Sequence, residues 1–302
     1  MNENYELGNF EGASPDDIED ALERSEVVYF ERCPFEMPSQ EDLEFLREEL
    51  PAQIKAKNVS YHPESDSVPR LDAPDESIER VTAILRSHQQ SVADFLTRSI
   101  PDLVPGWKIG TCSFRPCEER GRDLRPHASN ELVHIDAGAY GATNGSRIFR
   151  FFVNVNPTVS RIWGTKGGFA DLVASHDELL QAARGNGGKI RLQKNLADRA
   201  FSGLVGGLGK IIPLATVLDS SPYDRAMRRI HNYMKDSESF RNDQSDYRQI
   251  SFPPLSAWMV LTDGISHSVV SGQHCFVTTA LIPLENCRIP ELAPYNILQK
   301  AA

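Results

Sequence analysis

Apolar residues recur with two different periods along this chain, and the change falls near residue 105. Between residues 75 and 100 they return every three or four positions, which places them on one side of an α-helix. Two shorter helices are expected before it, one capped by Ser14 and one by Ser39, the second ending before Pro51. Residues 57–75 are polar and carry three prolines, so we expect a loop there. The first third of the chain is therefore expected to be helical, with one short strand at VVYF (27–30).

From residue 107 onward the apolar runs become short and rich in β-branched and aromatic residues, with Gly, Pro, Asn and Asp between them. Many short strands in one long segment favour a sandwich or a barrel over alternating βαβ units. A mixed segment at roughly 170–245 interrupts them, and it includes a predicted helix at 221–236 with Ser221 as its cap. The expected strands are WKIGTCSF (107–114), ELVHIDAG (131–138), RIFRFFVNVN (147–156), SAWMVLT (256–262) and HCFVTTALIP (274–283).

This change of period predicts two regions. Residues 1–104 are expected to form a helical region that packs on a β-rich core. That core takes up residues 105–302, with the mixed insertion at about 170–245 inside it.

Composition and charge narrow the classes of function. The 302 residues are 40% hydrophobic and 25% charged, which is ordinary for a globular protein. The formal net charge of −10 disfavours nucleic-acid binding, because phosphate backbones attract Lys and Arg. Five cysteines without a C-x-x-C pair favour a reducing compartment. The acidic N-terminal residues resemble neither a signal peptide nor a transit peptide, so we expect a cytoplasmic protein.

The strongest chemical signal is His134-Ile135-Asp136. Side chains two positions apart on a strand point to the same face, so His134 and Asp136 can bind one metal ion together. A second histidine would complete a two-histidine, one-carboxylate iron(II) site, which leaves open positions for a 2-oxo acid and dioxygen. The candidates are His176, His231, His267 and His274. His267 is preferred because it precedes a strand rich in β-branched residues, and His274 is the second choice. By itself, a single H-x-D pair is more often part of a polar surface strand.

Arginines follow this motif in NGSRIFRFFVNVNP (144–157). A guanidinium can hold the distal carboxylate of 2-oxoglutarate through two parallel hydrogen bonds. Arg147 and Arg150 are three positions apart, so one regular strand would point them to opposite faces; Asn154 shares the face of Arg150. The alternative is that both arginines form surface ion pairs. Arg115 is a third candidate, while Arg161 and Trp163 could line the mouth of the site, although Trp163 alone favours packing.

The ordered set of these motifs resembles the bacterial hydroxylases of Kdo (3-deoxy-D-manno-oct-2-ulosonic acid), and the resemblance covers most of residues 105–300. The stretches that carry it are SFRP (113–116), LVHIDAGAYGATNGSRIFRFFVNVNP (132–157), RIW (161–163), SPYDRAMRRIHNYMK (221–235) and ISFPPLSAWMVLTDGISHSVVSGQ (250–273).

The resemblance implies a mainly β fold with flanking helices around a double-stranded β-helix (jelly-roll, cupin-like) core. It implies iron(II), 2-oxoglutarate and dioxygen, and hydroxylation of Kdo at carbon 3 in the inner core of lipopolysaccharide. The iron-binding motif of the family falls on His134, Asp136 and His267, and its arginine-bearing strand falls on Arg147 and Arg150. Arg161, Trp163 and Gln273, which lie in matched segments, are the expected substrate-binding residues.

Residues 137–143 (AGAYGAT) differ from the usual loop of the family, which is more often built around Phe, Ser, Arg and Pro. A jelly-roll oxygenase with a different small-molecule acceptor is therefore an alternative, and a non-enzymatic sugar- or metal-binding jelly roll is another. A lipid-linked acceptor such as Kdo-lipid A would require peripheral contact with the inner face of the inner membrane. The mixed basic and apolar stretch 189–218 is the candidate surface for that contact. The sequence leaves the oligomeric state open.

Overall fold

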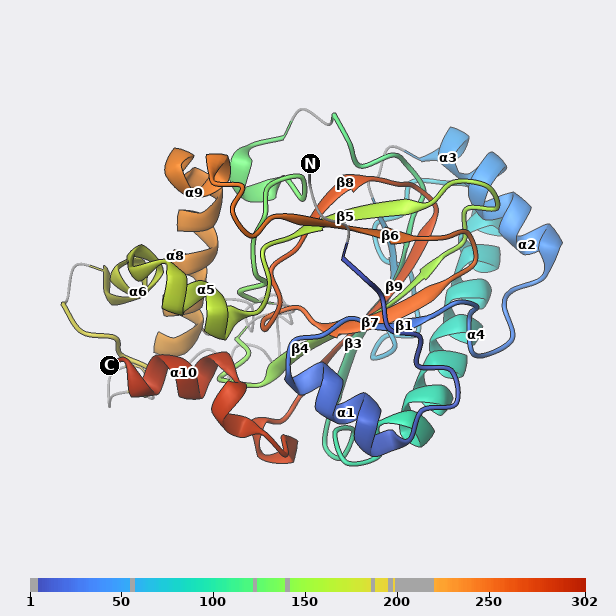
Figure 1. Cartoon of the computed structure of the whole chain (residues 1–302). Coiled ribbons are helices and arrows are strands. Elements are labelled where there is room, and N and C mark those ends of the chain that lie inside the picture. Colours follow the sequence, from blue (N-terminus) through green and yellow to red (C-terminus); the bar gives the residue numbers. More distant parts are fainter. Residues whose placement is uncertain are drawn as a thin grey trace.

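The computed structural model describes residues 5–54, 58–121, 124–138, 142–185, 188–194, 198 and 220–302. Its centre is a pair of facing antiparallel sheets (Figure 1). The larger sheet has the strand order β1-β7-β4-β9-β3-β2 and the smaller has the order β6-β5-β8. The expected mainly β, jelly-roll fold with flanking helices is confirmed. The strands are β1 (Val28–Phe30), β2 (Val59–Tyr61), β3 (Lys108–Arg115), β4 (Arg147–Asn154), β5 (Arg161–Thr165), β6 (Arg248–Phe252), β7 (Ala257–Leu261), β8 (Ser268–Ser271) and β9 (Cys275–Ile282).

Helices cover the outside of the larger sheet and one end of the sheet pair (Figure 1). The long helix α4 is the one expected from the period of apolar residues, and Ser14, Ser39 and Ser221 cap α1, α2 and α8 as expected. The helices are α1 (Pro15–Glu23), α2 (Gln40–Glu44), α3 (Leu50–Gln53), α4 (Asp75–Ser99), α5 (Phe169–Ser175), α6 (Asp177–Arg184), α8 (Pro222–Asp236), α9 (Glu238–Asn242) and α10 (Pro294–Lys300).

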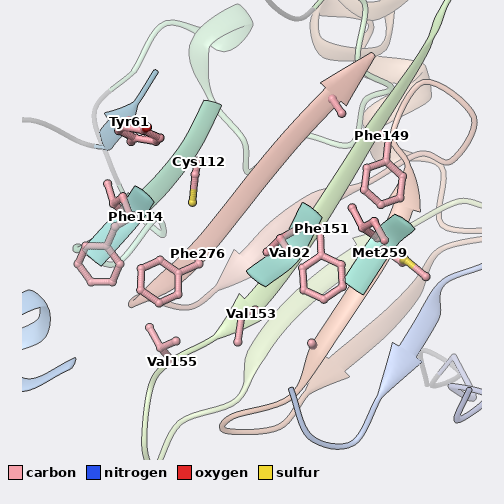
Figure 2. Close-up of a cluster of buried hydrophobic side chains, with 14 of the residues drawn as sticks. Tyr61, Val92, Cys112, Phe114, Phe149, Phe151, Val153, Val155, Met259 and Phe276 are labelled. Carbon is pink, nitrogen blue, oxygen red and sulfur yellow. The ribbon is translucent and has the colours of Figure 1, made fainter. Parts of the chain in front are cut away.

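Alternation along β4 divides the core into two layers. Phe149, Phe151 and Val153 point to the outer face of the larger sheet, where they meet the N-terminal helices (Figure 2). Phe152 has the opposite parity and packs between the two sheets with Trp163 and other residues of the smaller sheet. Since Arg150 shares the parity of Phe152, its guanidinium starts from the face that lies between the sheets.

The N-terminal region does more than pack helices on this core, because it also contributes strands to the larger sheet. Strand β1 pairs with β7, and β2 pairs with β3, so both edge strands of the larger sheet come from the first 61 residues. One hydrophobic cluster extends from Ile18 to Ile282. The loop expected at 57–75 therefore contains a strand, because Val59 and Tyr61 bury their side chains in that cluster while Ser60 stays half-buried.

Two further expectations were wrong in detail. The helix after Ser39 does not end before Pro51. A wider π-helical turn at Phe45–Glu49 leads into α3. Pro51 lies in the first turn of α3, where a backbone N–H, which proline lacks, is not required. The run ELVHIDAG does not form a regular strand. It is held by an isolated antiparallel bridge between His134 and His267.

The described part of the 170–245 insertion folds into α5, α6, α8 and α9, which pack with α10 in a second apolar cluster. Of the predicted membrane-contact stretch, the structure describes only residues 189–194 and 198. None of the helices in the described ranges has the length and apolar character needed to cross a membrane.

Candidate metal centre

His134 and His267 lie side by side in an antiparallel bridge, just before β8 of the smaller sheet. The amide N–H of His134 donates to the His267 carbonyl over 3.0 Å, and the reverse bond is 2.8 Å. These reciprocal bonds bring the two imidazole centroids to 4.6 Å. Two residues after His134, the amide of Asp136 donates to the Thr262 carbonyl over 2.9 Å. The segment 134–136 is thus extended and fixed at both ends, which gives the shared face that the H-x-D spacing predicts.

The three side chains place one donor atom each in the same buried space. Asp136 Oδ1 is 3.8 Å from Nε2 of His134 and 4.0 Å from Nε2 of His267. One ligand atom from each residue lies within 4.8 Å of the others. The Nδ1 atom of His134 is 2.7 Å from the Leu132 carbonyl, and Nδ1 of His267 is 3.1 Å from the Ile265 carbonyl. A carbonyl only accepts, so Nδ1 carries the proton in both rings and the Nε2 lone pairs face Asp136.

This donor set fits a divalent metal ion. Burial lowers the pKa of His134, with His267 and Lys235 adding to the effect, and burial also lowers the pKa of His267. Burial alone would raise the pKa of Asp136, but Arg150 and then the two histidines outweigh it, so the pKa lies well below its usual value. Two neutral imidazoles and one carboxylate are the protonation states that metal binding requires. Two nitrogens and one oxygen on one side of an ion are the donors typical of a non-haem iron(II) site.

Arg150 lies directly beside this group. Its Nε is 2.9 Å from Asp136 Oδ2, so the carboxylate faces Arg150 with one oxygen and the histidines with the other. The Arg150 side chain is 20% exposed, and it meets Asp136 through Nε alone. Of the predicted co-substrate arginines, Arg150 is therefore the one in direct contact with the triad.

Arg115 and Arg161 share one carboxylate, that of Glu119. Nη1 of Arg115 is 2.9 Å from Glu119 Oε1, and Nη2 of Arg161 binds the same oxygen. Asn130 donates to the other oxygen over 2.9 Å. The Nε atoms of both arginines are buried without a hydrogen-bond partner among the described residues. Arg115 is close enough to Asp136 for their charges to interact, so this cluster borders the triad.

Three other predicted residues have structural contacts instead. Arg147 is buried and pairs with Asp263 over 2.7 Å, on the opposite side of β4 from Arg150. The side-chain amide of Asn154 donates to the carbonyls of Val159, Phe252 and Pro253. Asn154 therefore fixes two loops rather than facing a ligand. Trp163 is buried and stacks on His267 with centroids 5.3 Å apart, which matches the packing alternative. Gln273 is half-buried after the end of β8.

Sequence reasoning missed three residues that support the centre. His231 on α8 donates from Nδ1 to the Ile135 carbonyl over 2.7 Å, and its ring lies edge-on to His134 at 4.9 Å. The hydroxyl of Thr262 contacts Asp136 and helps to lower its pKa. Glu119 orients the two arginines. His231 had been named only as a candidate metal ligand, and no short motif points to the other two, because their partners are distant in sequence.

The fold, the triad and the adjoining arginines together define a mononuclear non-haem iron(II), 2-oxoglutarate-dependent dioxygenase. The chain matches the model of the 3-deoxy-D-manno-oct-2-ulosonic acid (Kdo) hydroxylases over residues 9–302. This chain belongs to the Kdo hydroxylase family.

Solved structures of the Kdo hydroxylase KdoO, a non-haem Fe(II) α-ketoglutarate-dependent dioxygenase, share the fold. Its complex with α-ketoglutarate and Fe(III) is 25% identical to this chain, with a TM-score of 0.78 over 100% of this chain and 95% of that one. Its cobalt(II) complex is 26% identical, with the same TM-score, over 100% and 94%. The apo structure is 25% identical, with a TM-score of 0.77. The comparison with curated proteins found no match.

Proposed function

We propose that this chain hydroxylates Kdo at carbon 3, with iron(II) held by His134, Asp136 and His267. The observation that carries the proposal is the convergence of these three donor atoms within 4.8 Å, in a chain that matches the Kdo hydroxylase family almost end to end. Bound iron, with 2-oxoglutarate and dioxygen, supplies the oxidising power that protein side chains lack.

The residues around the triad hold the three proposed metal ligands in position and orient them. The Leu132 and Ile265 carbonyls fix the two imidazoles with Nε2 toward the metal position. Arg150 binds the outer oxygen of Asp136, which leaves the inner oxygen for the metal. Trp163 stacks on His267 and, with Phe152 and Trp258, makes an apolar wall that keeps water from that side of the site.

We assign the distal carboxylate of 2-oxoglutarate to Arg150, with Arg115 as the neighbouring cation. Arg150 contacts Asp136 through Nε, so its two Nη atoms can form parallel hydrogen bonds to another carboxylate. Arg115 has a buried Nε without a partner near the same place. Arg147 is excluded from this assignment because it pairs with Asp263 on the opposite side of β4 from Arg150.

The acceptor we propose is Kdo in lipid-linked form, in the inner core of lipopolysaccharide. An enzyme with this acceptor would work in the cytoplasm, in contact with the inner face of the inner membrane. The variant loop at 137–143 starts directly after Asp136, so it is placed to meet the acceptor; residues 139–141 lie outside the described residues.

The test is to incubate the protein with iron(II), 2-oxoglutarate, dioxygen and Kdo-lipid A. We expect succinate and a Kdo that has gained one oxygen atom, located at carbon 3 by NMR. The variant His267→Ala should give neither product, while Arg98→Gln, on the exposed end of α4, should match the wild type. Succinate without an oxygenated Kdo would assign a different acceptor to the same oxygenase.

A further inference from the structure

A strongly basic hollow lies away from the metal centre, between the C-terminal end of α6 and the N-terminal half of α8. Its volume is about 400 Å³, and five cationic side chains line it: Arg184, Lys189, Arg191, Arg225 and Arg229. Such a concentration is unusual in a chain whose net charge is −10. Like charges repel when they are brought together, so a cluster of this kind indicates an anionic ligand.

Two of the five cations are fixed in place. Arg229 donates from Nε to the Ala182 carbonyl over 3.1 Å, and from a terminal nitrogen to the Ala183 carbonyl. These carbonyls belong to the last turn of α6, where a cation interacts favourably with the helix end. Arg225 pairs with Asp198 over 2.9 Å. Arg225 and Arg229 line the same hollow, and burial, then the charge of Arg225, lower the pKa of Arg229.

The other three cations are available. Arg184, Lys189 and Arg191 are exposed, and none of them pairs with a carboxylate in the part of the chain that the structure describes. Among the described residues, the five cations of the hollow are therefore balanced by one carboxylate, that of Asp198.

The chemistry of this hollow fits a phosphate group better than a carboxylate. A carboxylate carries one charge and presents two oxygens, which one guanidinium fork can bind. A phosphate monoester carries more charge and presents three terminal oxygens, so it can use several arginines at once.

Helix α8 connects the hollow to the metal centre. Arg225 precedes His231 by six residues (231 − 225), or about 9 Å along the helix axis. His231 binds the Ile135 carbonyl, between the two metal-binding candidates His134 and Asp136. A ligand large enough to extend past α8 can reach both places.

We infer that this basic hollow binds a phosphate group carried by the acceptor, away from the sugar that is oxidised. The inference rests on the proposed function, because it takes the acceptor to be a phosphorylated, lipid-linked Kdo. It adds a second recognition element, which selects the charged lipid anchor rather than the reacting sugar.

The experiment compares a phosphorylated Kdo-lipid with the same lipid after its phosphates are removed, both in neutral detergent micelles. For the wild type we expect a lower KM with the phosphorylated lipid. The double variant Arg184→Gln/Arg191→Gln should raise that KM about tenfold, as expected for lost charged hydrogen bonds, with kcat unchanged. Its KM for the dephosphorylated lipid should equal that of the wild type. Arg98→Gln is the matched control, because Arg98 is also an exposed arginine in the last turn of a helix.

Direct binding separates this inference from the proposed function. Micelle binding of the phosphorylated lipid, measured by fluorescence without iron or 2-oxoglutarate, should weaken in the double variant even if no Kdo is hydroxylated. Inorganic phosphate should compete only weakly, since it lacks the rest of the acceptor. Equal binding of the two lipids by the wild type, or an unchanged affinity in the double variant, would overturn the inference. So would inorganic phosphate binding as tightly as the lipid, because the hollow would then be a site for free phosphate.

Discussion

Asp136 and Arg150 meet over 2.9 Å beside two histidines whose Nε2 atoms face the other oxygen of the same carboxylate. One carboxylate thus serves two neighbours. Its inner oxygen faces the two histidines that we assign to the metal, and its outer oxygen contacts the guanidinium that we assign to the co-substrate. This contact ties the position of the arginine to the position of the metal, so 2-oxoglutarate would be bound in a fixed relation to the iron.

The first prediction concerns Arg150. Arg150→Ala should raise the 2-oxoglutarate concentration needed for half-maximal succinate formation roughly 10- to 100-fold, as for loss of a charged hydrogen-bond pair. Arg150→Lys keeps the charge but loses the fork, so it should restore only part of the affinity. Succinate release at varied 2-oxoglutarate measures both. Normal use of 2-oxoglutarate with a weakened affinity for the sugar would instead assign Arg150 to the acceptor.

The second prediction concerns His231. His231→Phe keeps a ring against His134 but removes the hydrogen bond to the Ile135 carbonyl, which steadies the segment between His134 and Asp136. We expect iron(II) affinity to fall about tenfold, the lower end of the range for residues that orient metal ligands. Titration with cobalt(II), followed by its visible absorption, measures this without turnover. An unchanged cobalt affinity in a folded variant would show that His231 only packs.

The third prediction concerns the stability that Glu119 provides. Glu119→Gln removes the charge that Arg115 and Arg161 share in a buried place, so it should cost about 3 kcal/mol in urea unfolding near neutral pH. A much smaller loss would indicate that water or another carboxylate compensates the two arginines.

The same carboxylate predicts a pH dependence. Burial would raise the pKa of Glu119, but Arg115 and Arg161 outweigh it, so the folded-state pKa lies well below the ordinary value of 4.5. Below about pH 4.5 the unfolded chain takes up a proton that the folded chain does not, so the contribution of Glu119 to stability shrinks as the pH falls. The gap in unfolding free energy between wild type and Glu119→Gln should therefore narrow on acidification. A gap that stays constant from neutral pH to pH 4 would contradict this.

Local patterns in the sequence predicted the parts of the fold and site that depend on neighbouring residues. The caps at Ser14, Ser39 and Ser221 need only their own first turn, and the H-x-D spacing needs only an extended backbone. The short strand β2 was missed because its pairing with β3 lies about 50 residues away. Glu119 binds an arginine 42 residues further along the chain, and no local pattern encodes that contact. Parity along β4 correctly placed Arg147 and Arg150 on opposite faces.

The parity argument was less successful for Asn154. It shares the face of Arg150, as predicted, but its side-chain amide donates to the carbonyls of Val159, Phe252 and Pro253. Which polar residue on a face reaches a ligand depends on the loops that close over it, and loops are the least regular part of a sequence pattern.

The most direct test of the metal centre is an anaerobic titration of the purified apo-protein with iron(II) and 2-oxoglutarate, followed by visible absorption. We predict a weak charge-transfer band that requires both components and is lost in His267→Ala, with the fold of the variant checked by circular dichroism. The band would establish that the buried triad holds iron together with the 2-oxo acid. A folded wild-type protein that gives no band, or a band that persists in His267→Ala, would contradict the assignment of His134, Asp136 and His267 as the iron site.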